Sequence, residues 1–173
     1  MMGTRSHPTV SYQPYFVTAV TRNRTPIFRD RHAADLILKE LARLRDELGF
    51  ARLAYAVMPD HIHLLVAPSA GANLSRIMQS VKGRFARLWN RQLCRQGSLW
   101  QPRYYESAVR TEAQLMRWIE YIHRNPVQAG LAKSPEEYPY CSPGGKLGTD
   151  LEVYLKGSWT GRAEAQPSSK GRE

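Results

Sequence analysis

The chain has 173 residues, 42% of them hydrophobic, which suits a single domain with its own core. Its formal net charge of +10 favours a polyanionic partner, with nucleic acid ahead of an anionic membrane surface. Two cysteines without paired spacing argue against a disulfide framework or a thiolate zinc site, and no apolar run approaches the roughly 20 residues of a membrane span.

The N-terminal part of the chain predicts an arm, a strand and a helix. Residues 1–11 are polar and turn-rich, which predicts a flexible arm without the hydrophobic core of a signal peptide. Residues 14–21 are rich in β-branched and aromatic side chains and predict the first strand. Apolar positions recur at steps of three and four over residues 31–48, which predicts an amphipathic helix that Gly49 ends. We expect an intracellular, cytoplasmic protein.

A histidine pair follows in a predicted β-hairpin. Residues 52–58 form its first strand, and the short connection at Pro59 and Asp60 makes the second strand antiparallel to it. Alternate side chains of a strand share a face, so His61 and His63 point the same way. Histidine is the commonest metal ligand, so this strand provides half of a metal site. The pair could also be the polar side of a half-buried strand, and no local motif adds a third ligand.

The next helix, predicted over residues 74–93 with Asn73 as its N-cap, carries a row of basic side chains. The row comprises Arg84, Arg87, Arg91 and Arg95. Steps of three and four align them in a stripe about 16 Å long. No acidic residue occurs between Asp60 and Glu106, so the stripe favours phosphate contact over a merely solvated face.

Residues 99–109 predict a fourth strand, bent at Pro102. Trp100, Tyr104 and Tyr105 lie on it and could stack nucleobases. Aromatic residues near a strand more often belong to the core, and that reading stays open for all three.

The last predicted helix begins at Thr111, which forms a capping box with Gln114, and stops at Pro126. Tyr121 and Asn125 stand one turn apart on it, beside its apolar stripe. Both side chains can therefore address one point in space. Tyr121 could instead complete the core next to its apolar neighbours.

The order strand, helix, strand, strand, helix, strand, helix predicts an α+β protein with the ferredoxin-like split βαβ fold. We expect a four-stranded antiparallel sheet with helices on one face, plus an extra C-terminal helix that carries Tyr121. After Gly130 the chain is rich in proline and glycine, and residues 146–173 predict an irregular tail with a disordered end.

Three segments together resemble the REP-associated tyrosine transposases, which belong to the HUH class of single-strand DNA transposases. They are MPDHIHLLV (residues 58–66), LWQPRYY (residues 99–105) and YIHRNPVQAGL (residues 121–131). The three motifs occur in the order of the family. The resemblance covers residues 12–145, which we assign to one HUH transposase-like domain.

The resemblance implies a metal-dependent endonuclease and strand transferase that forms a 5′-phosphotyrosine intermediate. By motif, Tyr121 is the nucleophile, and the tyrosines at 104–105 are the fallback. His61, His63 and Asn125 would hold a divalent cation. Imidazole and amide ligands suit Mg²⁺ or Mn²⁺, and zinc is less expected.

The resemblance also implies the partners. The substrate would be single-stranded DNA beside a hairpin-forming repeat, because a base-paired phosphate is out of reach of a helix tyrosine. The four arginines of the stripe, together with Arg103, would bind this DNA. We expect a monomer rather than a homodimer, associated with the nucleoid and not with a membrane.

Two other functions fit the same residues. A non-catalytic protein that binds DNA hairpins needs only the basic stripe. A relaxase or replication-initiation nickase shares the histidine pair and the tyrosine chemistry, but the small size of the chain and the absence of an added helicase or oligomerisation domain argue against it.

Overall fold

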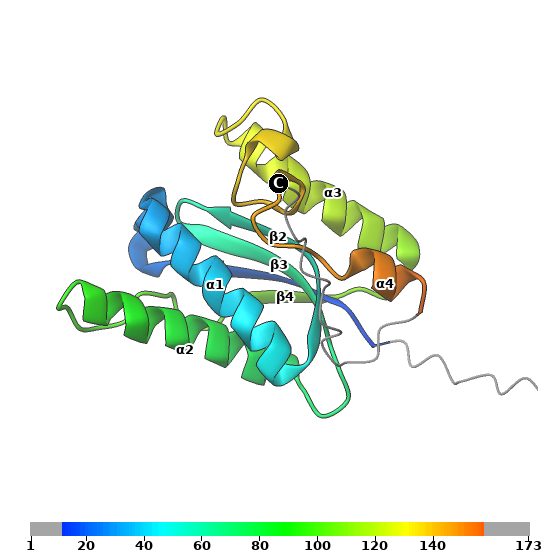
Figure 1. Cartoon of the computed structure of the whole chain (residues 1–173), viewed down its shortest axis with the longest axis horizontal. Coiled ribbons are helices and arrows are strands. Elements are labelled where there is room, and N and C mark those ends of the chain that lie inside the picture. The colour runs from blue at the N-terminus through cyan, green and yellow to red at the C-terminus, as the bar shows by residue number, and fades with distance from the viewer. Residues whose placement is uncertain (1–11, 158–173) are drawn as a thin grey trace, which may run out of the picture.

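The computed structural model describes residues 12–157 of the chain, so the predicted arm at residues 1–11 and the end of the predicted tail lie outside it. Within residues 12–157, the regular elements of the domain are four strands and four α-helices (Figure 1). They are β1 (Tyr15–Val20), α1 (Arg31–Leu48), β2 (Phe50–Met58), β3 (His61–Pro68), α2 (Leu74–Gln92), β4 (Tyr105–Ala108), α3 (Glu112–Gln128) and α4 (Leu151–Leu155).

The four strands form one antiparallel sheet in the order β2-β3-β1-β4, which confirms the predicted fold. The central pair sets the register that matters for function. Thr18 of β1 lies opposite His63 of β3, and Val20 lies opposite His61. Because opposite residues of an antiparallel pair project to the same face, Thr18 and the two histidines share one side of the sheet.

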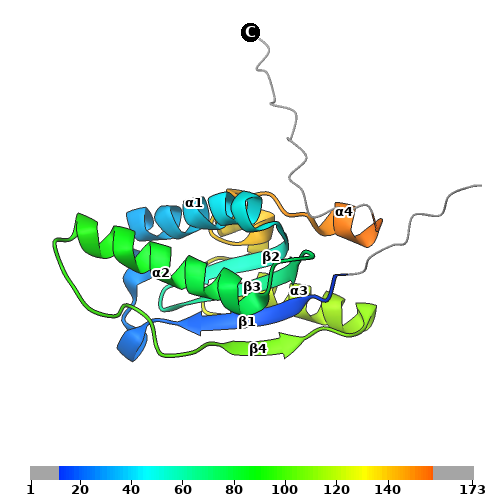
Figure 2. The same ribbon diagram turned by 90° about the horizontal axis from the view of Figure 1, so that it is seen from below.

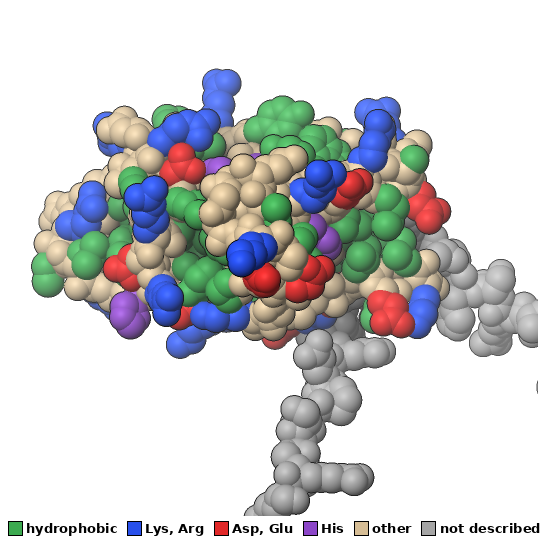
Figure 3. Space-filling view, turned by 90° about the horizontal axis from the view of Figure 1, so that it is seen from above, with side chains coloured by type: hydrophobic (Ala, Val, Ile, Leu, Met, Phe, Trp, Pro, Cys, Tyr) green, Lys and Arg blue, Asp and Glu red, His purple; other side chains and the backbone are tan. Residues whose placement is uncertain are grey.

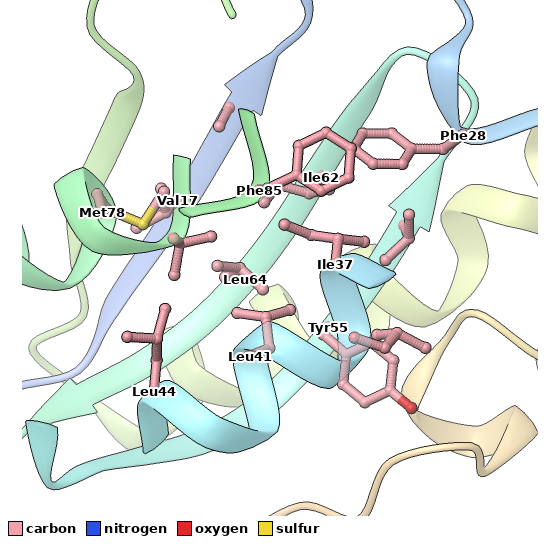
Figure 4. Close-up of a cluster of buried hydrophobic side chains, with 14 of the residues drawn as sticks. Val17, Phe28, Ile37, Leu41, Leu44, Tyr55, Ile62, Leu64, Met78 and Phe85 are labelled. Carbon is pink, nitrogen blue, oxygen red and sulfur yellow. The ribbon is translucent and has the colours of Figure 1, made fainter. Parts of the chain in front are cut away.

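Helices α1 and α2 cover one face of the sheet, and both lie above it in Figure 2. Their apolar stripes meet alternate side chains of the strands in a continuous core. Figure 4 shows this core, with Leu41 and Ile37 of α1 and Phe85 of α2 against Ile62 and Leu64 of β3. All five side chains are fully buried.

Helix α1 begins and ends where the sequence predicts, and α2 begins at the predicted residue and ends one residue earlier than predicted. The Asp30 carboxylate caps α1 by accepting the backbone N–H of His32 at 2.8 Å, and Gly49 ends the helix with a left-handed φ of 67°. The Asn73 side chain caps α2 by accepting the N–H of Arg76 at 2.8 Å.

Helix α3 covers part of the opposite face, where it buries Leu115, Ile119 and Ile122 against β2 and β3. The helix passes through Pro126 and ends at Gln128, so the predicted stop at the proline is wrong. Proline has no N–H to give to the carbonyl of Ile122, four residues earlier. The thiol of Cys141 lies 3.8 Å from that carbonyl oxygen and donates to it instead.

The fourth strand is shorter than predicted, because only Tyr105–Ala108 pairs with β1. Residues 101–104 are irregular, and Arg103 has a left-handed φ of 64° that no strand residue adopts. Trp100 retains a single bridge to Thr21.

Residues 146–157, predicted as irregular tail, pack onto the domain and contain α4. Asp150 joins α1 to the outer edge of β2. Its carboxylate pairs with the Arg45 guanidinium and accepts the Arg52 backbone N–H at 2.8 Å. Within residues 12–157, no helix is long and apolar enough to cross a membrane.

Candidate active site

The two predicted histidines converge at the end of β3. Their Nε2 atoms lie 3.1 Å apart. The other ring nitrogens are engaged from behind: Nδ1 of His61 is 2.6 Å from a carboxylate oxygen of Asp60, and Nδ1 of His63 is 2.8 Å from the Thr18 hydroxyl. An imidazole that donates Nδ1–H to a carboxylate keeps the lone pair on Nε2 free. His61 therefore directs an acceptor into the gap that the two rings share.

The surroundings of His63 keep its imidazole ring neutral. Burial, followed by the neighbouring His61, lowers the pKa of His63 to about 3, and a side-chain hydrogen bond with Asn125 only partly offsets this. Burial opposes ionisation of Asp60, but its hydrogen bond with His61, reinforced by Arg24, lowers its pKa overall. At neutral pH a carboxylate thus orients one imidazole, and the other imidazole is uncharged.

Helix α3 brings the tyrosine to this gap. Trp118 stacks on Phe16 of β1 with ring centroids 3.8 Å apart, which fixes the helix against the sheet. One turn on, the Tyr121 ring lies 5.4 Å from the His63 ring, measured between centroids. Its side chain is 43% exposed, so the phenol is not a core residue. Asn125, a further turn along α3, reaches His63 by the hydrogen bond described above.

The donor set fits a cation. Two ligands at right angles around an ion with bonds of about 2.1 Å stand about 3.0 Å apart, close to the separation of the two Nε2 atoms. Among residues 12–157, no group of three or more histidine, cysteine, aspartate or glutamate side chains could hold a metal ion. Asn125, which contacts His63, offers an amide oxygen as a third protein ligand.

The predicted arginine stripe lies elsewhere, because α2 covers the face of the sheet opposite Tyr121. Arg84 is paired with Glu47 of α1 at 3.0 Å. Glu47 lies outside the interval from Asp60 to Glu106, so the sequence did not reveal this acidic neighbour. Arg87 and Arg91 are exposed. Arg95 follows the helix and lines a cavity of about 380 Å³ together with Arg22.

On the α3 side of the molecule, basic side chains are spread over the surface with acidic and apolar groups between them (Figure 3). Arg103 is exposed in the segment that leads into β4. Charge alone would therefore not mark the active face.

The sequence did not identify two residues that orient the site, Thr18 and Asp60. Thr18 is 45 residues from His63 and becomes its neighbour only through strand register. Asp60 adjoins His61, and a carboxylate next to a candidate ligand is a signal that the sequence does contain.

The model of the family described as "Transposase IS200 like" matches residues 9–125, about two thirds of the chain. The chain belongs to the IS200-like transposase family. It is thus an HUH-type tyrosine transposase, in agreement with the resemblance of its three motifs.

Named relatives agree with this membership. The transposase is 28% identical over 138 residues to a Haemophilus influenzae protein named for the REP-associated tyrosine transposases, an alignment that covers 74% of this chain and 78% of that one. It is 24% identical to the REP-associated tyrosine transposase of Escherichia coli strain K12, over 76% and 81% of the two chains. A solved REP-associated tyrosine transposase bound to a REP hairpin has the same fold, with a TM-score of 0.65 at 19% identity over 99% and 98% of the chains.

Proposed function

We propose that this transposase cleaves and rejoins single-stranded DNA beside hairpin-forming repeats, with Tyr121 as the nucleophile. One observation carries the proposal: an exposed phenol stands against a pair of convergent imidazoles within a single chain. The complex of the structural neighbour with a REP hairpin supports the choice of substrate.

In the first step, the Tyr121 oxygen attacks the scissile phosphorus, and the bond from phosphorus to the 3′ oxygen breaks. The phenol loses its proton as the new bond forms, and the departing 3′ oxygen gains one. The products are a 5′-phosphotyrosine and a free 3′-hydroxyl, so the energy of the phosphodiester is kept. In the second step, a 3′-hydroxyl attacks the phosphotyrosine and releases Tyr121.

His61, His63 and Asn125 would hold a divalent cation, Mg²⁺ or Mn²⁺, with Mn²⁺ the better match to two nitrogen ligands. Such an ion neutralises charge on the phosphoryl oxygens, which a phenol needs because it holds its proton at neutral pH and is a weak nucleophile. The contribution of the chain itself is to hold the phenol and the scissile phosphate in a fixed line.

The site needs no second subunit, because ligands and nucleophile meet within one chain. We therefore propose a monomer that works in cis. Arg87, Arg91, Arg95 and Arg103 would bind phosphates, and Arg84 would contribute least because Glu47 neutralises it. The stripe lies on the other layer from Tyr121, so it would hold the duplex of a hairpin whose single-stranded flank enters the site.

The test is covalent capture of a labelled hairpin oligonucleotide with single-stranded flanks, in the presence of Mn²⁺, followed by a denaturing gel. Tyr121→Phe should abolish the protein–DNA adduct and bind the oligonucleotide about as tightly as the wild type. Tyr105→Phe is the matched control, because Tyr105 is the other exposed tyrosine near the sheet, and it should still form the adduct. An adduct with Tyr121→Phe would refute the assignment. Binding without any adduct from the wild-type protein would instead favour a hairpin-binding protein that does not cut.

A further inference from the structure

Two aromatic side chains break the pattern of burial in this domain. Of the phenylalanine, tryptophan and tyrosine side chains in residues 12–157, only Tyr105 and Tyr121 are exposed, by 57% and 43%. Both rings touch the same buried ring, Phe16, with centroid distances of 6.0 Å and 5.7 Å. The proposed function uses Tyr121 and gives Tyr105 no role.

Strand register places Tyr105 on the active face. Thr18 of β1 lies opposite His63 on one side and opposite Tyr105 of β4 on the other. Directly opposite residues project to the same face, so His63, Thr18 and Tyr105 form one row across three strands. With strands about 4.8 Å apart, the backbone of Tyr105 lies about 10 Å from that of His63. Tyr105 therefore stands beside the reacting centre and not in it.

The chain that leads to Tyr105 is held firmly. The ammonium group of Lys82 on α2 donates to the carbonyl oxygens of Gln101 and Arg103 at 2.9 Å and 2.7 Å. The Gln101 N–H donates to Val20 of β1 at 2.9 Å. These bonds fix the approach to β4, including the exposed Arg103. An aromatic ring held in place on a fixed backbone loses little entropy when a partner stacks on it.

The other aromatic residues of this segment are used inside the protein. Trp100 is 5% exposed, and its indole N–H donates to the Lys82 carbonyl at 3.0 Å. Tyr104 is half-buried against the main core. Of the three rings that the sequence offered for base stacking, only Tyr105 is exposed, whereas Tyr104 is half-buried and Trp100 is buried.

We propose that Tyr105 is a stacking subsite for an unpaired nucleobase next to the phosphate that Tyr121 attacks. This inference rests on the proposed function for the identity of the substrate. An exposed ring stacks on any base and is tolerant of sequence, so Tyr105 positions the flank of the hairpin and does not read it. The exposed Arg103, two residues away, supplies a cation for the backbone of the same flank.

The test measures DNA affinity without cleavage, in the Tyr121→Phe background. Two probes are compared: a hairpin with a single-stranded flank and the same hairpin with a blunt end. Adding Tyr105→Ala should weaken binding of the flanked hairpin about 5- to 150-fold, the range for loss of one base-stacking contact, and leave the blunt hairpin unchanged. Tyr105→Trp should restore the affinity. Met116→Ala, which removes an exposed apolar side chain of α3, is the matched control and should change neither affinity.

A second measurement locates the base. Flanked hairpins with 2-aminopurine at successive positions should show quenched fluorescence at one position, and Tyr105→Ala should remove that quenching. Equal loss of affinity for both hairpins, or unchanged affinity for the flanked one, would overturn the proposal. Because no adduct is needed, a failure here is distinct from a failure of the cleavage proposal, which would appear as absence of an adduct in the wild-type protein.

Discussion

The two faces of β3 differ in what covers them. On one face, Ile62, Leu64 and Val66 are fully buried beneath α1 and α2. On the other, His61 and His63 stand at the strand end beside the exposed Tyr121 of α3, and Leu65 and Ala67 farther along the strand are fully buried. One face of β3 therefore carries only core side chains, whereas the other carries core side chains and, at one end, the histidine pair of the site. Neighbouring residues of one strand should therefore respond to mutation in opposite ways.

The largest expected effect is on the face that carries the histidine pair. His63→Ala removes one imidazole of the pair, and with it the cation that is expected to lower the barrier by several kcal/mol. Adduct formation should fall about 1,000-fold or more, and calorimetry should detect no Mn²⁺ binding. His32→Ala, at an exposed histidine of α1, should leave both unchanged. Wild-type adduct formation by His63→Ala would show that the pair does not serve catalysis.

The adjacent residue, Leu64, probes the face of β3 beneath α1 and α2. Leu64→Ala leaves a cavity between the sheet and α1, and should lower the free energy of unfolding by about 2–5 kcal/mol. Denaturant titration measures this loss. At temperatures where the variant is folded, it should still bind Mn²⁺ like the wild type. A loss of Mn²⁺ affinity as large as that of His63→Ala would mean that the two faces are not separate.

The fold was largely predictable because its patterns are local. Apolar steps of three and four defined α1, and Asn73 and Thr111 capped the next two helices as expected. The Thr111 hydroxyl accepts the Gln114 N–H at 3.1 Å, while the Gln114 amide oxygen reaches Arg110, one residue before the cap. Local chemistry of this kind depends on neighbours in sequence, which the sequence shows.

What the sequence missed depends on distant partners. Pro126 should end a helix, but Cys141 supplies the hydrogen bond that the proline removes. Asp150 looks like part of a polar tail, yet it joins Arg45 to the edge of β2. Arg84 appeared unopposed because Glu47 lies 37 residues earlier in the chain. In each case the deciding neighbour is brought by the fold.

The same holds for the site. The motifs named His61, His63, Tyr121 and Asn125, and the structure brings them together, although their roles remain proposals. No pattern along the chain could show that Thr18 supports His63, because that contact requires the register of β1 on β3.

The smallest expected effect concerns Cys141, which is buried in the core cluster beneath α3. Burial raises the pKa of the Cys141 thiol to about 12 from an ordinary value of 9.0. Above pH 9 the unfolded chain therefore releases a proton that the folded protein retains, so stability falls as the pH rises. At pH 10 this costs about 1.4 kcal/mol.

Between pH 8 and pH 10, the free energy of unfolding of the wild type should fall by about 1.4 kcal/mol more than that of Cys141→Ala. Denaturant titration at each pH measures this difference. Cys94→Ala, at the exposed cysteine, is the matched control and should follow the wild type. Identical pH profiles for all three proteins would mean that water reaches the Cys141 thiol and that burial does not raise its pKa.

The central claim is that the phenol on α3, and no other, takes the DNA. The most direct measurement is mass spectrometry of the tryptic peptide that remains linked to DNA after covalent capture. Trypsin separates the candidates, because Tyr121 lies in the peptide of residues 118–124 and the tyrosines at 104–105 lie in that of residues 104–110. A nucleotide on Tyr121 is the result that this structure predicts, and a nucleotide on the peptide of residues 104–110 would contradict it.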